Sequence, residues 1–187
     1  MATLRLYSGL VFILLSAGAL SAQPLVDWKP FVEEEAGFAV KSPAPLLHRV
    51  DTTYTPLGPL AYHTFFYRVP EALKRKGSNQ VYMVSLCDYP PGTLEREAPD
   101  WLQTFFEETI AAAARSVGGQ VIYKTDLEIE GHPGYLWRIR GPGGKFTIKT
   151  KALLAGRRYY AVQVVSTSGR SVNAASETFM DSFRLLP

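Results

Sequence analysis

Four segments of alternating side-chain character follow one another between residues 121 and 166, and short glycine-containing turns separate them. The segments cover 121–130, 135–140, 146–152 and 158–166, and the turns fall at 131–134, 141–144 and 155–156. Successive side chains of a strand point to opposite faces of a sheet, so this alternation predicts strands, and turns this short connect antiparallel neighbours. The sequence therefore predicts an antiparallel meander with one apolar and one polar face.

Three further strands are expected before the meander. They fall at 37–43 and 81–88, where the side chains again alternate in character, and at 61–69, where aromatic residues lie on both faces. Residues 43–59 contain four prolines and one glycine and are expected to form loops. The only cysteine, Cys87, lies in the third of these strands. A small buried side chain is the expected role for it, and an intermolecular disulfide or a reactive thiol is the alternative.

Two helices are expected. The first follows Asp100, which is a suitable N-cap, with Gln103 placed to complete a capping box and Gly118 placed to end the helix. The second lies near the C-terminus, with Ser171 as its cap. Each carries an apolar stripe at spacings of three and four, formed by Leu102, Phe105, Phe106, Thr109, Ile110, Ala113 and Val117 in the first and by Val172, Ala175, Phe179, Met180 and Phe183 in the second.

Both apolar stripes need a partner, and the apolar face of the sheet is the large one that the pattern offers. The predicted fold is therefore α+β: an antiparallel sheet of about six to seven strands with helices packed across it, resembling an α/β/α sandwich. The expected organisation is a single domain at 37–187, preceded by an N-terminal arm at 23–36 that carries the acidic run 33–35.

The N-terminus has the pattern of an export signal. Arg5 precedes an apolar run at 10–20, and small residues cluster at 16–22. Residues 1–22 are therefore expected to form a cleaved signal peptide, and an uncleaved membrane anchor is the alternative. Cleavage predicts an exported protein, periplasmic or extracellular, that is not integral to the membrane.

Positive charge is concentrated in the C-terminal part of the chain. Residues 131–176 contain no Asp or Glu but eight basic residues. Arg138 and Arg140 share one face of their predicted strand, and Lys149 and Lys151 share one face of theirs. The six predicted partner-binding residues are Arg138, Arg140, Lys149, Lys151, Arg157 and Arg158, the last two near the edge of the patch. An electrostatic docking surface is one interpretation, and a solvated outer sheet face is the other.

Motifs for chemistry are absent from the sequence. His48, His63 and His132 are scattered, and no metal-binding spacing, nucleophile elbow, phosphate loop or cofactor motif occurs. We therefore predict no catalytic residues, no metal and no cofactor. Nucleic acid is not an expected partner, because the protein is exported and the aromatic residues near the basic ones alternate to the opposite face.

Four short motifs resemble the PsbP-like/Mog-like fold group: residues 37–43 at the start, 131–135 before a strand, 157–160 opening the last long strand and 179–183 at the end. The resemblance covers roughly 27–187 and implies a sheet sandwiched by helices. In that group PsbP-type proteins attach to the lumenal side of photosystem II, and Mog-type proteins bind a small GTPase. The resemblance thus implies an accessory or binding domain, and it carries no functional residue over to this chain.

These observations predict an exported, non-enzymatic accessory or binding domain that docks to a protein or an anionic envelope component through a basic sheet face. Two alternatives stay open. One is a carrier of a small apolar ligand between sheet and helices, and the other is a small hydrolase without a recognisable motif.

Overall fold

The computed structural model describes residues 27–55, 58–74, 79–94, 100–167 and 173–187. The predicted signal peptide at 1–22 and the predicted cap Ser171 lie outside these residues. Within the described chain, ten strands form two antiparallel sheets. The α+β fold class is confirmed.

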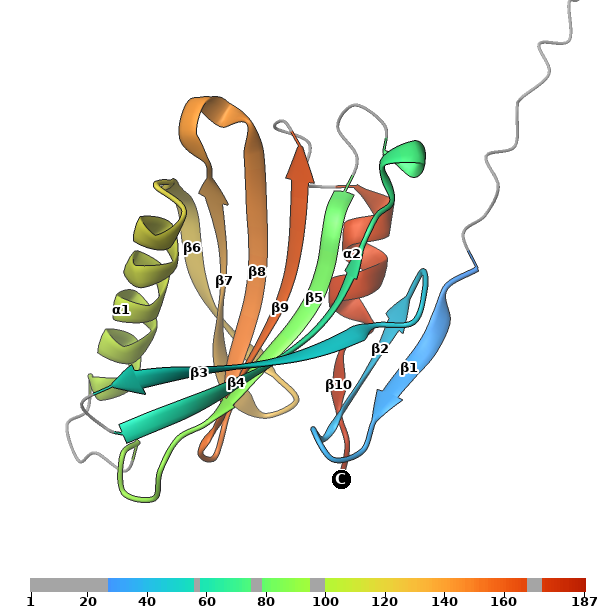
Figure 1. Ribbon diagram of the computed structural model, residues 1–187. Helices are drawn as coiled ribbons and strands as arrows, with labels where there is room; N and C mark the ends of the chain where they lie inside the picture. Colours follow the sequence, from blue (N-terminus) through green and yellow to red (C-terminus); the bar gives the residue numbers. More distant parts are fainter. Residues whose placement is uncertain (1–26, 56–57, 75–78, 95–99, 168–172) are drawn as a thin grey trace, which may run out of the picture.

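The larger sheet has seven strands in the order β3-β4-β5-β9-β8-β7-β6 (Figure 1). Its strands are β3 (Leu47–Thr55), β4 (Gly58–Arg68), β5 (Asn79–Asp88), β6 (Gln120–Ile129), β7 (His132–Arg140), β8 (Phe146–Ala155) and β9 (Arg158–Thr167). Strands β6 to β9 are consecutive in the chain and adjacent in the sheet, as the meander prediction requires. The sheet is strongly twisted, so that β3 and β4 cross the direction of β8 at a steep angle.

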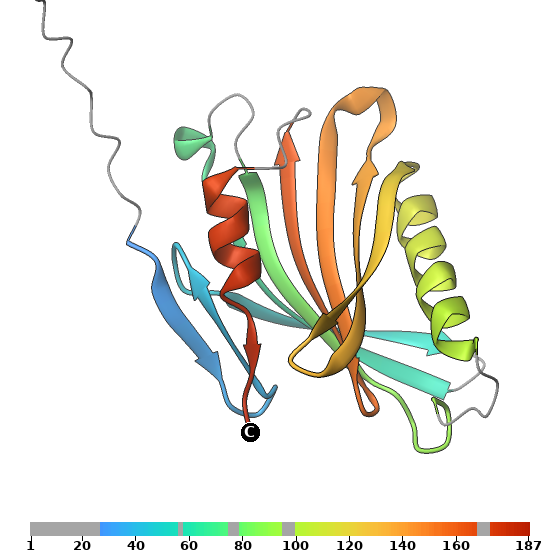
Figure 2. The same ribbon diagram turned by 180° about the vertical axis from the view of Figure 1, so that it is seen from behind.

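Helix α1 (Trp101–Ser116) packs on one face of this sheet, and α2 (Ala174–Asp181) packs on the other. Figure 2 shows the two helices on opposite sides of the sheet and at opposite ends of it. The expectation of one apolar and one polar face is therefore wrong. Strands β8 and β9 are buried on both faces, because the run Tyr159–Val164 is apolar at nearly every position instead of at every second one.

Two cores result. The core under α2 contains Phe38, Phe65, Val84, Leu153, Val162, Val164, Phe179 and Met180. The core under α1 contains Phe106, Ile110, Ala114, Trp137, Ile139, Ala152 and Ala161. Each helix therefore has an apolar partner of its own.

A second sheet of three strands, β1 (Lys29–Glu33), β2 (Phe38–Ser42) and β10 (Arg184–Leu185), lies beside α2. Strand β1 falls in the predicted N-terminal arm. It pairs with β2 in regular antiparallel register, and Phe31 contacts the rings of Phe38 and Phe65. This segment of the arm is thus a strand that covers the core.

The loop expected at 43–59 is wrong for most of its length, because Leu47–Thr55 forms β3. This strand is the outer edge of the sheet, and its first eight residues are all exposed. An edge strand exposed on both faces needs no apolar alternation, so the periodicity that identifies the other strands is absent here. Two short 3₁₀ turns, η1 (Glu71–Leu73) and η2 (Pro142–Gly144), complete the described elements.

The helix ends differ from their predicted caps. Asp100 precedes α1 but makes no side-chain cap hydrogen bond, so the predicted capping box with Gln103 is absent. Gly118 follows the end of α1 with a φ of 59°, a left-handed conformation that suits glycine. Helix α2 is capped by Asn173, whose side chain accepts a hydrogen bond from the backbone N–H of Ser176.

Candidate functional site

The four predicted sheet cations do lie on one face of β7 and β8. Arg138 is directly opposite Lys149 in the antiparallel register, and such pairs point to the same face. Arg140 lies two residues after Arg138, and Lys151 lies two residues after Lys149, so both point to the same face as these two residues. This face is the one that α2 covers in part.

The two lysines are not free to meet a partner. Lys149 is buried, and its Nζ donates to both carboxylate oxygens of Glu177 on α2, at 2.8 and 2.9 Å. Lys151 Nζ donates to Oδ1 of Asp181 and to the carbonyl of Met180, both at 3.3 Å. The two lysines therefore fasten α2 to the sheet, and the predicted solvent-facing patch of four cations is wrong for these two.

The two remaining cations, Arg138 and Arg140, we call the arginine pair. Neither has a carboxylate within ion-pair distance in the described part of the chain. The Arg138 guanidinium lies 5.0 Å from the ring centre of Tyr123 on β6, a cation–π contact that orients it. Arg138 Nε is buried and, among the described residues, has no hydrogen-bond partner.

A buried hydroxyl next to the arginine pair also lacks a hydrogen-bond partner within the described chain. Thr147 lies directly opposite Arg140 in the register and is 2% exposed, and its Oγ1 has no hydrogen-bond partner in the described chain. Buried polar atoms without a partner are uncommon in proteins. The arginine pair and Thr147 thus form a small polar region with spare hydrogen-bonding capacity on the α2-side face.

Arg157 and Arg158 are not at the edge of this region. Arg158 opens β9 and pairs with Ala155, six residues beyond Lys149 along β8. At the rise of a strand, this places Arg158 about 20 Å from Lys149. The six predicted residues therefore fall into two groups that are separated along the direction of the strands.

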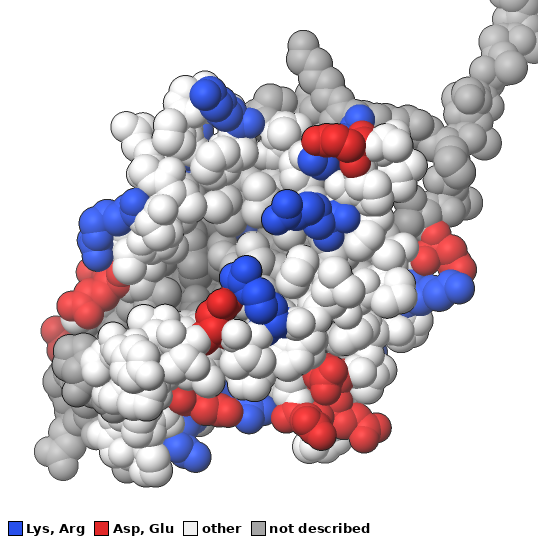
Figure 3. All heavy atoms as spheres, in the orientation of Figure 1, with Lys and Arg blue, Asp and Glu red and all other residues white. Residues whose placement is uncertain are grey.

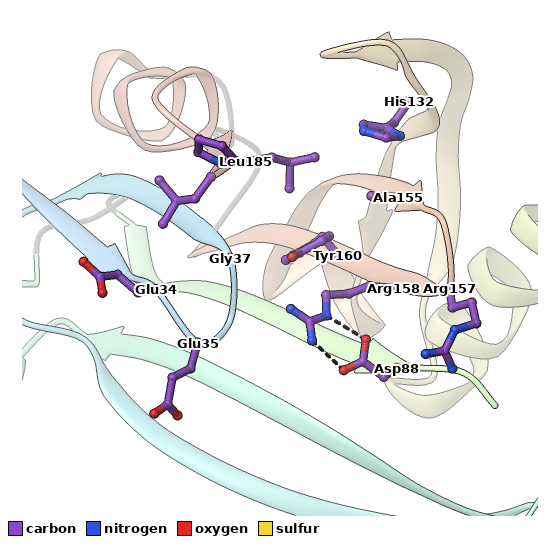
Figure 4. A pocket seen from close by; sticks show the side chains of 12 residues that line it. Glu34, Glu35, Gly37, Asp88, His132, Ala155, Arg157, Arg158, Tyr160 and Leu185 are labelled. Atoms are coloured by element: carbon purple, nitrogen blue, oxygen red, sulfur yellow. Dashed lines mark hydrogen bonds and ion pairs between the residues drawn. The ribbon is translucent and has the colours of Figure 1, made fainter. Parts of the chain in front are cut away.

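Arg157 and Arg158 line an open pocket of about 560 Å³ between the two sheets (Figure 4). Arg158 donates to both oxygens of Asp88, from Nε at 2.6 Å and from Nη2 at 2.7 Å. This hydrogen bonding holds the pKa of Asp88 below its usual value, although partial burial acts in the opposite direction. Arg157 points away from Arg158, and its Nη1 donates to the carbonyl of Tyr89 at 2.8 Å.

The pocket also joins the two sheets. The carbonyl of Ala36 accepts hydrogen bonds from the Tyr160 hydroxyl at 2.8 Å and from Nη1 of Arg158 at 3.2 Å. Glu34 and Glu35, at the turn between β1 and β2, and His132, at the start of β7, complete its charged and titratable lining. Because Arg158, Asp88 and Tyr160 are engaged with one another or with backbone, these three groups have a structural role.

Phenol groups and the single thiol gather on the α1-side face. Burial raises the pKa of Tyr62, Cys87, Tyr89 and Tyr159. The Cys87 side chain is fully buried, so the expected role as a small core residue is confirmed and a reactive thiol is disfavoured. Next to this group, an open pocket of about 520 Å³ borders α1, and its lining includes Tyr89, Leu94, Trp101, Phe105 and Ala112.

The described residues contain no group of three or more His, Cys, Asp or Glu side chains placed to hold a metal ion. Two histidines meet on the edge hairpin: His48 Nε2 and His63 Nδ1 are 3.2 Å apart, and the His48 ring stacks on Phe65. His63 is half-buried. None of the described helices is both long and apolar enough to cross a membrane.

Charge on the face turned to the reader in Figure 3 is mixed. Lys and Arg side chains lie in small groups between Asp and Glu groups, and no continuous positive surface forms there. The α2-side face, which carries the arginine pair, is turned away in this view. The face seen in this view therefore carries no extended surface of one charge sign.

Comparison with known proteins identifies the fold. No protein-family model matches the chain, and no curated relative matches it. Among solved structures, the chain is similar to the solution structure of cyanobacterial PsbP (CyanoP) from Synechocystis sp. PCC 6803, with a TM-score of 0.52 and 12% sequence identity. The match covers 90% of this chain and 98% of that one. The fold is therefore PsbP-like, whereas the Mog-like part of the resemblance stays a prediction.

Proposed function

We propose that this chain is an exported accessory domain without catalytic activity, which binds a protein or an anionic envelope component through the arginine pair. The observation that carries the proposal is that Arg138 and Arg140 share a sheet face and that neither has an acidic partner among the described residues. The neighbouring lysines, in contrast, are both paired. The proposed contact surface is thus narrower than the six residues expected from sequence.

The chemistry of the pair favours an anionic group with two acceptor oxygens. A guanidinium presents several donors in a planar fork that matches a carboxylate or a phosphate. Arg138 is half-buried and stacked on Tyr123, so its orientation is restricted and its charge is less screened than that of a surface lysine. The free hydroxyl of Thr147 offers a further donor close by.

The fold and the N-terminus support the accessory class and its compartment. The fold resembles that of cyanobacterial PsbP, and the sequence resemblance implies accessory and binding roles. Residues 1–22 have the pattern of an export signal. Two of the charged groups of the pocket, Asp88 and Arg158, are bound to each other, which favours a binding domain over a hydrolase.

Reversing the charge of the arginine pair tests the proposal. Arg138→Glu/Arg140→Glu is compared with Lys41→Glu/Arg184→Glu, which makes the same change in net charge at two exposed cations of the smaller sheet. Wild-type protein and both variants are used as bait in the native host, and the recovered partner is quantified. Loss of two charge-assisted contacts predicts about a hundredfold weaker binding for the arginine variant only. Equal recovery of the partner by both variants would refute the proposal.

One observation favours a second candidate, a carrier of a small apolar ligand. The pocket beside α1 has aromatic walls formed by Trp101, Phe105 and Tyr89 and a volume suited to a small molecule. Ala112 lines this pocket from an exposed helix position, so Ala112→Trp places a large ring at the pocket without disturbing the core. Saturable binding of a fluorescent fatty acid to the wild type, lost in Ala112→Trp, would favour the carrier.

A further inference from the structure

Strand β3 is an edge strand that lacks several of the features that usually protect an edge from pairing. It runs for nine residues in unbroken register with β4 and contains no proline, lysine or bulge. Three of its apolar side chains are exposed: Leu47 at 64%, Val50 at 49% and Tyr54 at 85%. Figure 1 shows β3 running across the front of the molecule. Alternate residues of this strand point their backbone N–H and C=O groups away from β4.

The opposite edge of the same sheet has a bulge and more charged residues, although Val121 and Ile122 are exposed there too. Strand β6 has a register shift between Val121 and Tyr123, and its outer part carries Lys124, Asp126 and Glu128. A bulge and a row of charges are the usual means of keeping an edge unpaired. The contrast indicates that β3 is an edge built to accept another strand.

The order of charges in β3 identifies a second copy of the chain as the strand it accepts. A two-fold axis perpendicular to the sheet at Val50 places Val50 opposite Val50 of the second copy. The same axis places Arg49 opposite Asp51 of the second copy, and Asp51 opposite Arg49, so that two unlike pairs form on one face. Within one chain Arg49 Nη2 and Asp51 Oδ2 already lie 2.7 Å apart, and both side chains are exposed. The dimer would join these charges into a network of four.

Other registers lose this match. Moving the axis to Arg49 places arginine opposite arginine, and moving it to Asp51 places aspartate opposite aspartate. Axes at His48 or Thr52 place neither charge opposite an unlike one. We propose that two copies of the chain associate through antiparallel pairing of their β3 strands about Val50, which joins the two seven-stranded sheets into one. The arginine pair lies on β7, away from this edge, so each copy keeps its proposed binding surface.

Charge swaps test both the association and its register. In Arg49→Asp all four central charges of the dimer are negative, and in Asp51→Arg all four are positive. Sedimentation velocity of each protein, from the low to the high micromolar range, should show a dimer for the wild type. Turning two unlike pairs into like pairs should weaken dimerisation by about thirtyfold in each single variant.

Mixing the two single variants gives the decisive result. Arg49→Asp presents two acids and Asp51→Arg presents two arginines, so the mixture should form a heterodimer whose affinity returns to within a fewfold of the wild type. The swap Arg49→Asp/Asp51→Arg in one chain should also restore the dimer. Mixing cannot repair the ion pair within either chain, so recovery reports contact between copies. A wild type that stays monomeric at all concentrations, or a mixture that stays monomeric, would overturn the proposal.

Val50→Lys supplies an independent variant at the axis. It places two ammonium groups opposite each other, at a position exposed enough to tolerate the change in the monomer. Circular dichroism checks that each variant is folded. Loss of the dimer is expected, whereas a dimer of unchanged affinity in Val50→Lys would also contradict the proposed pairing.

Discussion

The ion pair between Lys149 and Glu177 should stabilise the protein far more than an ordinary surface pair. Removing one partner of a fully buried pair costs about 3–5 kcal/mol, and exposed pairs contribute about 0.2–1 kcal/mol. The Lys149 side chain is 9% exposed and that of Glu177 is 37% exposed, so this pair lies between the two limits. Glu177→Gln leaves a buried ammonium group without its counter-charge, and we expect it to lower the free energy of unfolding by about 2 kcal/mol.

The two ends of the pair should respond unequally. Lys149→Met removes the buried charge and keeps most of the apolar side chain, while the Glu177 carboxylate that remains can be hydrated. We therefore expect it to cost under about 1 kcal/mol. Adding Glu177→Gln to Lys149→Met should lower the free energy of unfolding by almost nothing more. The Lys149 ammonium group, which Glu177→Gln would leave unpaired, is absent from that variant.

Urea unfolding followed by circular dichroism measures these differences. For a chain of this size, about 2 kcal/mol corresponds to a fall in Tm of about 4–8 °C. Asp181→Asn is the matched control, because the Asp181 side chain is 68% exposed and its pair with Lys151 should contribute under about 1 kcal/mol. If Glu177→Gln and Asp181→Asn unfold at the same urea concentration, Lys149 is not held under α2 and the reasoning fails.

Three further predictions concern other parts of the fold. The pair with Arg158 lowers the pKa of Asp88 below 3.8, so its stabilisation is present above that value and is lost as the pH falls through the lowered pKa. Between about pH 5 and pH 2 the wild type should lose more stability than Asp88→Asn, by under about 1 kcal/mol because the carboxylate is half exposed; parallel pH profiles would contradict this. Gly134→Ala should destabilise the protein by about 1–3 kcal/mol in urea unfolding, since a Cβ there would lie 2.3 Å from the carbonyl oxygen of Ala152; an unchanged midpoint would count against that close approach. Cys87 should react with a thiol reagent only after unfolding, because it is buried and its pKa is raised; rapid labelling of the native protein would be incompatible with that burial.

The sequence predicted the elements whose periodicity matches their burial. Helix α1 lies where the apolar spacing placed it, because it has one buried stripe, and the strands β6 to β9 lie close to the predicted segments, because short turns separate them. Strand β3 was missed because it is exposed on both faces. Strand β1 was missed because the acidic run at 33–35 led us to assign its segment to an N-terminal arm. Gly134 was assigned to a turn but lies in β7, where the backbone of β8 approaches too closely for any side chain.

The site was less predictable than the fold. Alternation correctly placed Arg138 and Arg140 on one face of β7 and Lys149 and Lys151 on one face of β8, and the short turn made the two strands antiparallel neighbours. It gave no information about which helix would cover that face. A charged lysine is expected to be exposed, but Lys149 is buried under α2 and pairs with Glu177, 28 residues later in the chain. No local sequence pattern predicts such a contact. The separation of Arg157 and Arg158 from the arginine pair could have been inferred from strand length alone.

Zero-length carbodiimide cross-linking, read by peptide mass spectrometry, tests the arrangement of the two helices most directly. It joins carboxylates to amines that are in contact, so the account predicts a link between Lys124 and Glu107, which lie 2.7 Å apart at α1, and a link between Lys149 and Glu177 at α2. Both links in one preparation would show helices on opposite faces of the sheet. A link at α1 together with an unlinked, freely modified Lys149 would contradict the account.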